Sequence, residues 1–262
     1  MRLDAFIAQN GLAKSREYAQ KLIESGLVTV NSKIVTKSSY FISEDGSDDV
    51  KITGELFPYV SRGGLKLKEA LDKFDIDVKG KICIDIGSST GGFTDCLLQN
   101  GARHVYCVDC GTNQLDITLR QREDITLYEN FNARYLESSM VKSPCDIATM
   151  DVSFISQEKL YEPITRVISE GSVLISLIKP QFECGTAGLS KGGIVKDAAI
   201  HRIVLSKVLL CADKSGFVPC GLIRSPIAGG DGNQEFIAYF KYSKDKREQS
   251  DDFIKSLIKS LF

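Results

Sequence analysis

Along residues 59–240, short apolar runs alternate with stretches in which apolar residues recur at helical spacing. This alternation is typical of a doubly wound α/β sheet, in which strands and helices follow one another along the chain. We expect seven strands, at residues 82–86, 104–109, 125–128, 146–151, 172–178, 217–224 and 234–241.

The first 42 residues follow a different pattern, which predicts a small α+β domain. Apolar positions within residues 3–23 fit two short helices, and Ser15 is a suitable N-cap for the second. Short apolar runs at 28–30 and 34–36 predict a β-hairpin. Residues 43–58 are polar and acidic, which is typical of a linker. We therefore expect two domains, 1–58 and 59–262.

The composition is that of an ordinary soluble globular protein, with 262 residues, 43% hydrophobic and 26% charged. The longest apolar stretch, 173–178, is far shorter than the ~20 residues of a membrane helix. The amphipathic tail at 250–262 fits a helix docked on the sheet better than a membrane anchor. No signal peptide is visible at the N-terminus, so we expect a cytoplasmic protein.

Cysteine and histidine usage argues against a metal site. The chain has eight cysteines but a single C-x-x-C pair, at 107–110, and only two histidines. Structural zinc sites need four ligands at suitable spacing. We therefore expect free thiols and no bound metal.

The net charge of −1 hides an uneven distribution. Residues 1–42 carry six bases against three acids, whereas residues 43–57 carry five acids against one base. A basic segment of this kind is where a polyanion would bind, although it would equally suit a solvated face.

A glycine-rich turn follows the first strand of the predicted sheet and opens a helix, within residues 83–94. Its pattern D-x-G-x-x-x-G-G differs from the dinucleotide fingerprint G-x-G-x-x-G, and it is typical of S-adenosyl-L-methionine binding. Another nucleotide, such as NAD, is the alternative. Helix N-terminal amides favour negative charge, so they suit the carboxylate of the methionine part. The cofactor contacts expected here are Asp85, Gly87, Gly91, Gly92 and Phe93.

Three polar residues at the ends of later strands complete the predicted cofactor site. Asp109 lies 24 residues after Asp85, a spacing that suits an acid on the ribose hydroxyls of a nucleoside. Asn132 follows the third strand and is expected at the adenine or ribose. Asp151 ends the fourth strand, beside the expected place of the sulfonium.

The residues around the predicted site narrow the class of methyl acceptor. Residues 151–154 lack the Asn/Asp-Pro-Pro-Tyr motif that is usual in enzymes that methylate amino groups. Methylation of cytosine C5 needs a nucleophilic cysteine, for which Cys184 is a minor candidate. A hydroxyl acceptor needs alignment and a group that takes its proton. Lys179, which emerges from an apolar strand at the ligand-binding edge of the sheet, could fill that role.

The N-terminal segment resembles the S4 RNA-binding domain in three strings, at residues 2–4, 11–16 and 26–31. Ser32 stands where that family often has glycine, so the hairpin turn must tolerate a side chain there. The resemblance implies that basic side chains of the second helix face structured RNA, with protein contact as the alternative. The RNA contacts expected are Arg2, Lys14, Arg16, Lys21 and Lys33, with Arg62 of the following domain.

Residues 59–240 resemble the FtsJ-like ribose 2′-O-methyltransferases in four strings, at 61–67, 150–156, 177–183 and 232–236. With the S4-like segment in front, the whole chain resembles the TlyA family. The resemblance implies a Rossmann-like sheet whose last strand is antiparallel, S-adenosyl-L-methionine as cofactor, and a cytidine of ribosomal RNA as acceptor. It also implies a catalytic tetrad of Lys66, Asp151, Lys179 and Glu235.

The resemblance also implies roles within the tetrad. Lys179 would orient and deprotonate the hydroxyl, Lys66 and Glu235 would hold it through charge coupling, and Asp151 would position the sulfonium. The glycine-bearing loop 185–193 is expected to order over the RNA. Taken singly, each tetrad residue would suit a solvated charge or a strand-end cap.

Two other functions stay open at this point. One is an RNA-binding assembly protein with a silent methyltransferase fold, but the tetrad and glycine turn are intact. The other is a cytotoxin, as the haemolysin label of the TlyA family suggests. The absence of a secretion signal and of a membrane-spanning segment speaks against it.

Overall fold

The structure is a computed structural model that describes residues 1–13, 15–43, 46–54, 58–185, 188–190, 192–229, 232–245 and 251–262. The chain divides into two compact units, Met1–Pro58 and Tyr59–Phe262. Each unit has its own hydrophobic core, and each is described by itself below.

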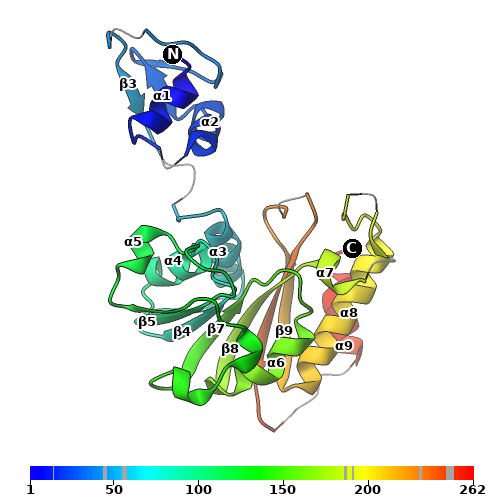
Figure 1. The fold of residues 1–262 in the computed structure, drawn as a ribbon. Helices are drawn as coiled ribbons and strands as arrows, with labels where there is room; N and C mark the ends of the chain where they lie inside the picture. Colours follow the sequence, from blue (N-terminus) through cyan, green and yellow to red (C-terminus); the bar gives the residue numbers. More distant parts are fainter. Residues whose placement is uncertain are drawn as a thin grey trace. The chain divides into compact units, whose positions relative to one another are not determined.

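The smaller unit packs two helices, α1 (Leu3–Gln9) and α2 (Arg16–Glu24), against a three-stranded sheet (Figure 1). Apolar side chains from both helices and from the central strand form one buried cluster. As predicted, the Ser15 hydroxyl caps α2, because it accepts a hydrogen bond from the Tyr18 amide at 3.1 Å.

The sheet of the smaller unit has the order β2-β1-β3, with strands β1 (Val28–Val30), β2 (Lys33–Ile34) and β3 (Val50–Ile52). The expected linker assignment is therefore wrong for β3, which pairs antiparallel with β1. Three residues flanked by acids give too short an apolar pattern for a strand to be recognised. At the hairpin turn, Asn31 and Ser32 both have positive φ, 50° and 62°, so this turn accommodates a serine in the left-handed region.

The larger unit is built on a seven-stranded sheet of order β6-β5-β4-β7-β8-β10-β9. All neighbours are parallel except β10, which is antiparallel to both β8 and β9. The predicted doubly wound α/β fold with an antiparallel last strand is thus confirmed. The strands are β4 (Ile82–Ile86), β5 (His104–Val108), β6 (Ile125–Tyr128), β7 (Cys145–Met150), β8 (Ile168–Ile178), β9 (Phe217–Arg224) and β10 (Phe236–Tyr242).

Helices cover both faces of this sheet (Figure 1). Apolar residues of α3 (Gly63–Lys73) and α4 (Gly92–Gln99) pack on one face, in one buried cluster. Apolar residues of α6 (Glu158–Thr165), α8 (Ala198–Lys214) and α9 (Asp251–Lys259) pack on the other face. Shorter elements, placed in loops, are α5 (Ile117–Arg120), η1 (Ala133–Tyr135), η2 (Ser138–Met140) and α7 (Pro180–Glu183).

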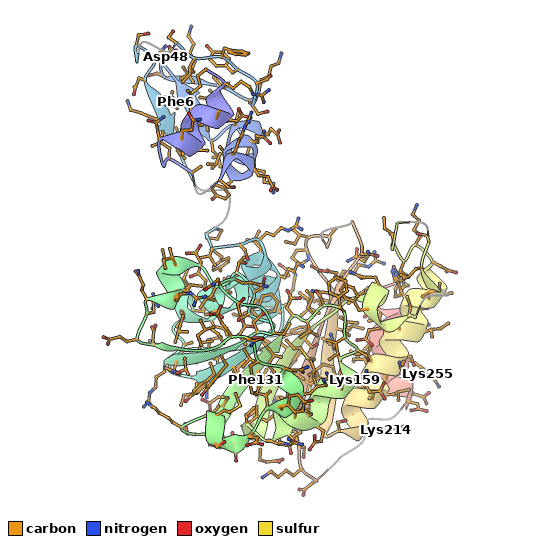
Figure 2. All side chains as sticks on the ribbon, in the orientation of Figure 1. Phe6, Asp48, Phe131, Lys159, Lys214 and Lys255 are labelled. Atoms are coloured by element: carbon orange, nitrogen blue, oxygen red, sulfur yellow. The ribbon has the colours of Figure 1, made fainter. Side chains whose placement is uncertain are left out.

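The C-terminal helix α9 docks on the sheet, as its amphipathic pattern predicts. Ile254 and Ile258 are buried, whereas charged side chains such as Lys255 stay exposed at the periphery, as does Lys214 at the end of α8 (Figure 2). Within the part of the chain that the structure describes, no helix is both long and apolar enough to cross a membrane.

Candidate active site

The glycine turn connects β4 to α4 and leaves no room for side chains. Gly87 has φ +81°, and a Cβ there would lie 2.4 Å from the carbonyl oxygen of Asp151. Gly91, with φ +93°, is the left-handed N-cap of α4. A Cβ on Gly92 would lie 2.3 Å from the Ser61 hydroxyl oxygen. The glycines therefore let the turn pack tightly against its neighbours, while Gly87 and Gly92 also line the pockets described below.

Asp85 lies behind the turn and lines neither of the two pockets described below. Its buried carboxylate accepts hydrogen bonds from the Thr94 hydroxyl of α4 at 2.7 Å and the Thr149 hydroxyl of β7 at 2.8 Å. Burial raises the pKa of Asp85 to about 6. Side chains alternate along a strand, so Asp85 points toward α4. It holds the start of α4, so the structure gives it a supporting place behind the turn, and its predicted cofactor contact stays a prediction.

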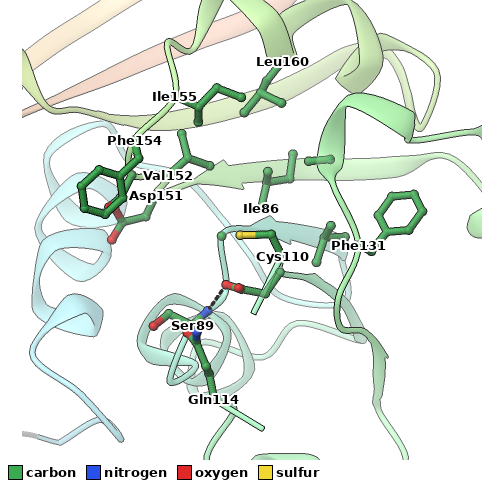
Figure 3. A pocket seen from close by; sticks show the side chains of 15 residues that line it. Ile86, Ser89, Cys110, Gln114, Phe131, Asp151, Val152, Phe154, Ile155 and Leu160 are labelled. Carbon is green, nitrogen blue, oxygen red and sulfur yellow. Dashed lines mark hydrogen bonds between the residues drawn. The ribbon is translucent and has the colours of Figure 1, made fainter. Parts of the chain in front are cut away.

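A first pocket of about 320 Å³ opens beside the turn, at the carboxyl ends of β4, β5 and β7 (Figure 3). Asp109 lines it, and its carboxylate accepts hydrogen bonds from the backbone amides of Ser89 and Gly111, both at 2.7 Å. Apolar side chains, among them Phe131 and Ile155, form the walls. The pocket thus combines a fixed carboxylate, bare backbone and apolar walls.

Asn132 does not line this pocket, although its neighbours Phe131 and Ala133 do. Its side-chain oxygen caps η1 by accepting a hydrogen bond from the Arg134 amide at 3.1 Å. Asn is a common residue at such caps, and the sequence alone does not separate a cap from a ligand contact. The sequence did not predict Phe131 as a residue of the site, although it lines this pocket (Figure 3).

A second pocket of about 290 Å³ adjoins the first. Gly92 and Phe93 at the start of α4 line it, together with Arg62 and the tetrad residues Lys66, Asp151 and Lys179. The residues common to both pockets are Gly87, Ser89, Asp151 and Ser153.

The four residues of the predicted tetrad form two ion pairs. Lys179 Nζ lies 2.5 Å from Asp151 Oδ1 and donates a hydrogen bond to the Ser153 hydroxyl at 2.9 Å. Lys66 Nζ donates to Glu235 Oε2 at 2.5 Å. The side chains of Lys66 and Glu235 are 8% and 3% exposed, so this pair is buried.

Strand order explains why these distant residues meet. Asp151 and Lys179 follow the adjacent parallel strands β7 and β8, so both lie at the carboxyl edge of the sheet. Because β10 is antiparallel, its start lies at that same edge, and Phe236 pairs with Ile178. Glu235, which precedes β10, therefore reaches Lys66 on α3.

A buried polar network, missed by the sequence reasoning, holds the loops after β7 and β8 together. Glu183 of α7 accepts hydrogen bonds from the Ser156 hydroxyl and the Gln157 amide, both at 2.8 Å. Burial raises the pKa of Glu183. The Gln157 side chain donates to the Leu177 carbonyl at 2.7 Å. These bonds fix the loops that carry Asp151 and Lys179.

Phe154 is a second residue that the sequence reasoning missed. It is 91% exposed and has φ 62°, an uncommon conformation for a bulky residue. Its ring centroid lies 4.9 Å from that of Phe182, and Phe154 lines the first pocket (Figure 3). The fold therefore holds an aromatic ring in solvent beside the ion pairs.

Cys184 does not fit the alternative of cytosine C5 methylation. Burial raises the pKa of its thiol, whereas a nucleophilic cysteine needs a thiolate. No group of three or more His, Cys, Asp or Glu side chains that could hold a metal ion occurs among the described residues.

The residues predicted to contact RNA are spread over both units. In the smaller unit, Arg2 and Arg16 both pair with Asp4, and Lys21 pairs with Glu17 on the exposed face of α2. Lys33 is exposed, and Lys14 lies outside the described residues. Arg62 belongs to the larger unit.

Comparison with known proteins matches both units. The family described as FtsJ-like methyltransferase matches residues 59–242, and the S4 domain matches residues 1–49. The chain is 44% identical to YqxC of Bacillus subtilis, described as a candidate rRNA methyltransferase, over 94% of this chain and 88% of that protein. It is 34% identical to the 16S/23S rRNA (cytidine-2′-O)-methyltransferase TlyA of Mycobacterium tuberculosis, over 94% of this chain and 91% of that protein.

A solved structure resembles the chain over nearly its whole length. It is described as a candidate hemolysin from Streptococcus thermophilus and superposes with a TM-score of 0.77 at 40% identity. The match covers 99% of this chain and 94% of that one.

Proposed function

The chain belongs to the TlyA family of FtsJ-like methyltransferases, and we propose that it methylates a ribose 2′-hydroxyl of ribosomal RNA with S-adenosyl-L-methionine as methyl donor. One observation carries this proposal: the Lys179–Asp151 pair lies where two adjoining pockets share a wall. One pocket would take the cofactor and the other the acceptor. We propose cytidine as the acceptor because a relative's name specifies it. Ribosomal RNA as substrate would place the reaction in the cytoplasm.

The first pocket fits S-adenosyl-L-methionine by its chemistry. The Asp109 carboxylate suits two ribose hydroxyls, and the walls around Phe131 suit the apolar faces of adenine. The backbone of Gly87 lines this pocket, and the amides that open α4 at Gly92 suit a carboxylate. When bound, this cofactor supplies a methyl group on a positively charged sulfur.

Lys179 is proposed to act on the hydroxyl. Lys179 lines the second pocket, where its amine would orient the hydroxyl and take its proton while the oxygen gains the methyl group. Asp151 lines both pockets, so its carboxylate would be shared between Lys179 and the positive charge of the cofactor.

Lys66 and Glu235 are proposed to hold the charge balance of the acceptor pocket. The Lys66 ammonium lines that pocket and is fixed from behind by the buried Glu235 carboxylate. Lys66 and Lys179 line the same pocket, so both side chains would face the acceptor.

Phe154 and Arg62 are proposed to hold the RNA around the acceptor. A base that is splayed out of single-stranded RNA can stack on an exposed aromatic ring, and Phe154 offers one beside the pocket. Arg62 lines the acceptor pocket and suits a phosphate oxygen. The S4 domain would add phosphate contacts that set the register.

Transfer of labelled methyl groups to purified ribosomal subunits, with mapping of the modified ribose, tests the proposal. Lys179→Ala should lose at least ~100-fold in rate, while calorimetry should show that it still binds S-adenosyl-L-methionine. Lys159→Ala, at an exposed lysine of α6, is the matched control and should keep full activity.

The outcomes separate the parts of the proposal. Absence of cofactor binding by the unaltered protein would refute the proposed methyltransferase activity. Cofactor and RNA binding without methyl transfer would favour a silent, RNA-binding assembly protein. Unchanged activity of Lys179→Ala would refute only the role of that lysine.

A further inference from the structure

Asp4 is the only acid of the smaller unit that is buried, among the residues that the structure describes. It lies on α1 with no exposed surface, and its carboxylate accepts five hydrogen bonds from three side chains. Arg2 donates through Nε at 3.0 Å and Nη2 at 2.9 Å. Arg16 donates through Nε at 3.1 Å and Nη2 at 3.3 Å, and Gln20 donates at 2.7 Å.

Both arginines bind Asp4 through the same edge of the guanidinium group, formed by Nε and Nη2. A guanidinium has five N–H donors, so each arginine keeps about three of them, including both on Nη1. The side chains of Arg2 and Arg16 are 38% and 54% exposed. The outer edge of each guanidinium therefore remains available for a second, bidentate contact.

Asp4 also makes it possible for the two arginines to lie close together. Two guanidinium groups repel each other unless an anion lies between them. The Arg2 hydrogen bonds hold the pKa of Asp4 well below its usual range, so the carboxylate stays charged at any working pH. The anion is bonded on all sides, and this fixes side chains that would otherwise sample many rotamers.

We propose that Asp4 is a positioning residue, which holds Arg2 and Arg16 as a preformed fork for the phosphate groups of structured RNA. This inference rests on the proposed function, since it assumes that the smaller unit binds RNA. Arginine matches phosphate geometry through paired N–H groups, and a fork that is already ordered loses less freedom on binding.

The charge change in Asp4→Asn separates this proposal from simple electrostatics. The substitution keeps the size of the side chain and makes the domain more positive by one charge. Attraction between net charges alone would then strengthen binding to a polyanion and steepen its salt dependence. Loss of the preformed fork would weaken binding instead. Whether Asp4→Asn binds RNA more weakly or more tightly therefore distinguishes the fork from attraction between net charges.

The test measures binding of the full chain to a ribosomal RNA transcript by filter binding at several salt concentrations. We expect Asp4→Asn to lose ~10-fold in affinity at every salt concentration, as should Arg2→Gln and Arg16→Gln. Arg16→Gln should lower RNA affinity much less when it is added to Asp4→Asn than when it is made alone, because Asp4→Asn has already removed the fork. Glu17→Gln is the matched control: it removes one negative charge from an exposed pair and should leave affinity equal or tighter.

Arg16→Lys keeps the charge and removes the fork, and circular dichroism reports whether each variant is folded. If Asp4→Asn fails to fold, Arg16→Lys tests the proposal in its place, and its affinity for RNA should fall ~10-fold. Unchanged or tighter binding by a folded Asp4→Asn, or by Arg16→Lys, would overturn the inference. Failure of the unaltered chain to bind RNA would overturn the proposed function as well.

Discussion

Replacing Asp85 with Asn should change how the stability of the larger unit depends on pH. Burial between α4 and β7 raises the pKa of this carboxyl from its ordinary value of 3.8 to about 6. An acid with a raised pKa ionises more easily in the unfolded chain than in the folded one. The stability that depends on this group is therefore complete below about pH 4 and is lost as the pH rises to about 6.

The size of the effect follows from the two pKa values. A difference of about 2 between folded and unfolded states corresponds to ~3 kcal/mol. Asn has the shape of Asp and does not ionise, and hydroxyls such as those of Thr94 and Thr149 can accept as well as donate hydrogen bonds. The free energy of unfolding of Asp85→Asn, minus that of the unaltered protein, should thus rise by ~3 kcal/mol between about pH 4 and pH 7.

Urea unfolding followed by circular dichroism at a series of pH values measures this difference for the transition of the larger unit. Thr149→Val provides a second check, because the Thr149 hydrogen bond lowers the pKa of Asp85. Its loss should move the pH range of the stability change upward. Parallel pH profiles for the unaltered protein and Asp85→Asn would refute the reasoning.

Three further predictions concern the site itself. Glu235→Gln should lower the free energy of unfolding by ~3–5 kcal/mol, measured with urea, because it leaves the Lys66 ammonium buried without its anion. The double variant Lys66→Met/Glu235→Leu should regain most of that stability but no methyl transfer. A double variant as unstable as Glu235→Gln would contradict this prediction. Gly87→Ala should weaken S-adenosyl-L-methionine binding at least ~10-fold in calorimetry, because its Cβ would lie 2.4 Å from the Asp151 carbonyl oxygen; unaltered affinity would show that the turn can relax. Phe154→Ala should weaken RNA binding ~10-fold without lowering stability, because the ring is 91% exposed; equal affinity would exclude the ring from the RNA-binding surface.

The periodicity of the sequence was enough to predict the large sheet. Most of its strands are apolar runs bounded by polar residues, and all seven occur within a few residues of the expected ranges. The strand that was not predicted is β3 of the smaller unit, which is three residues long and pairs with a strand about twenty residues earlier in the chain. Its existence depends on a non-local contact, which a local pattern does not contain.

The residues of the predicted tetrad differ in how far the sequence alone could place them. Asp151 and Lys179 could be placed from their positions at strand ends, because parallel strands share a carboxyl edge. The ion pair of Lys66 and Glu235 joins residues 169 positions apart, and no spacing rule predicts it. For that pair, only the family resemblance supplied the expectation. The motif assigned Asp85 to the cofactor, whereas the hydrogen bonds of its carboxylate to Thr94 and Thr149 could not be predicted from that motif.

The position of β10 also has a consequence for the synthesis of the chain. β10 is the last strand to be made, yet it lies between β8 and β9 in the sheet. Until it emerges, β8 presents a mostly apolar strand edge, and such edges readily pair with other chains. The same strand brings in Glu235. An interrupted chain would thus lack one residue of the proposed tetrad and be prone to aggregate, so the proposed site and the cover of this strand edge would be completed in a single late step.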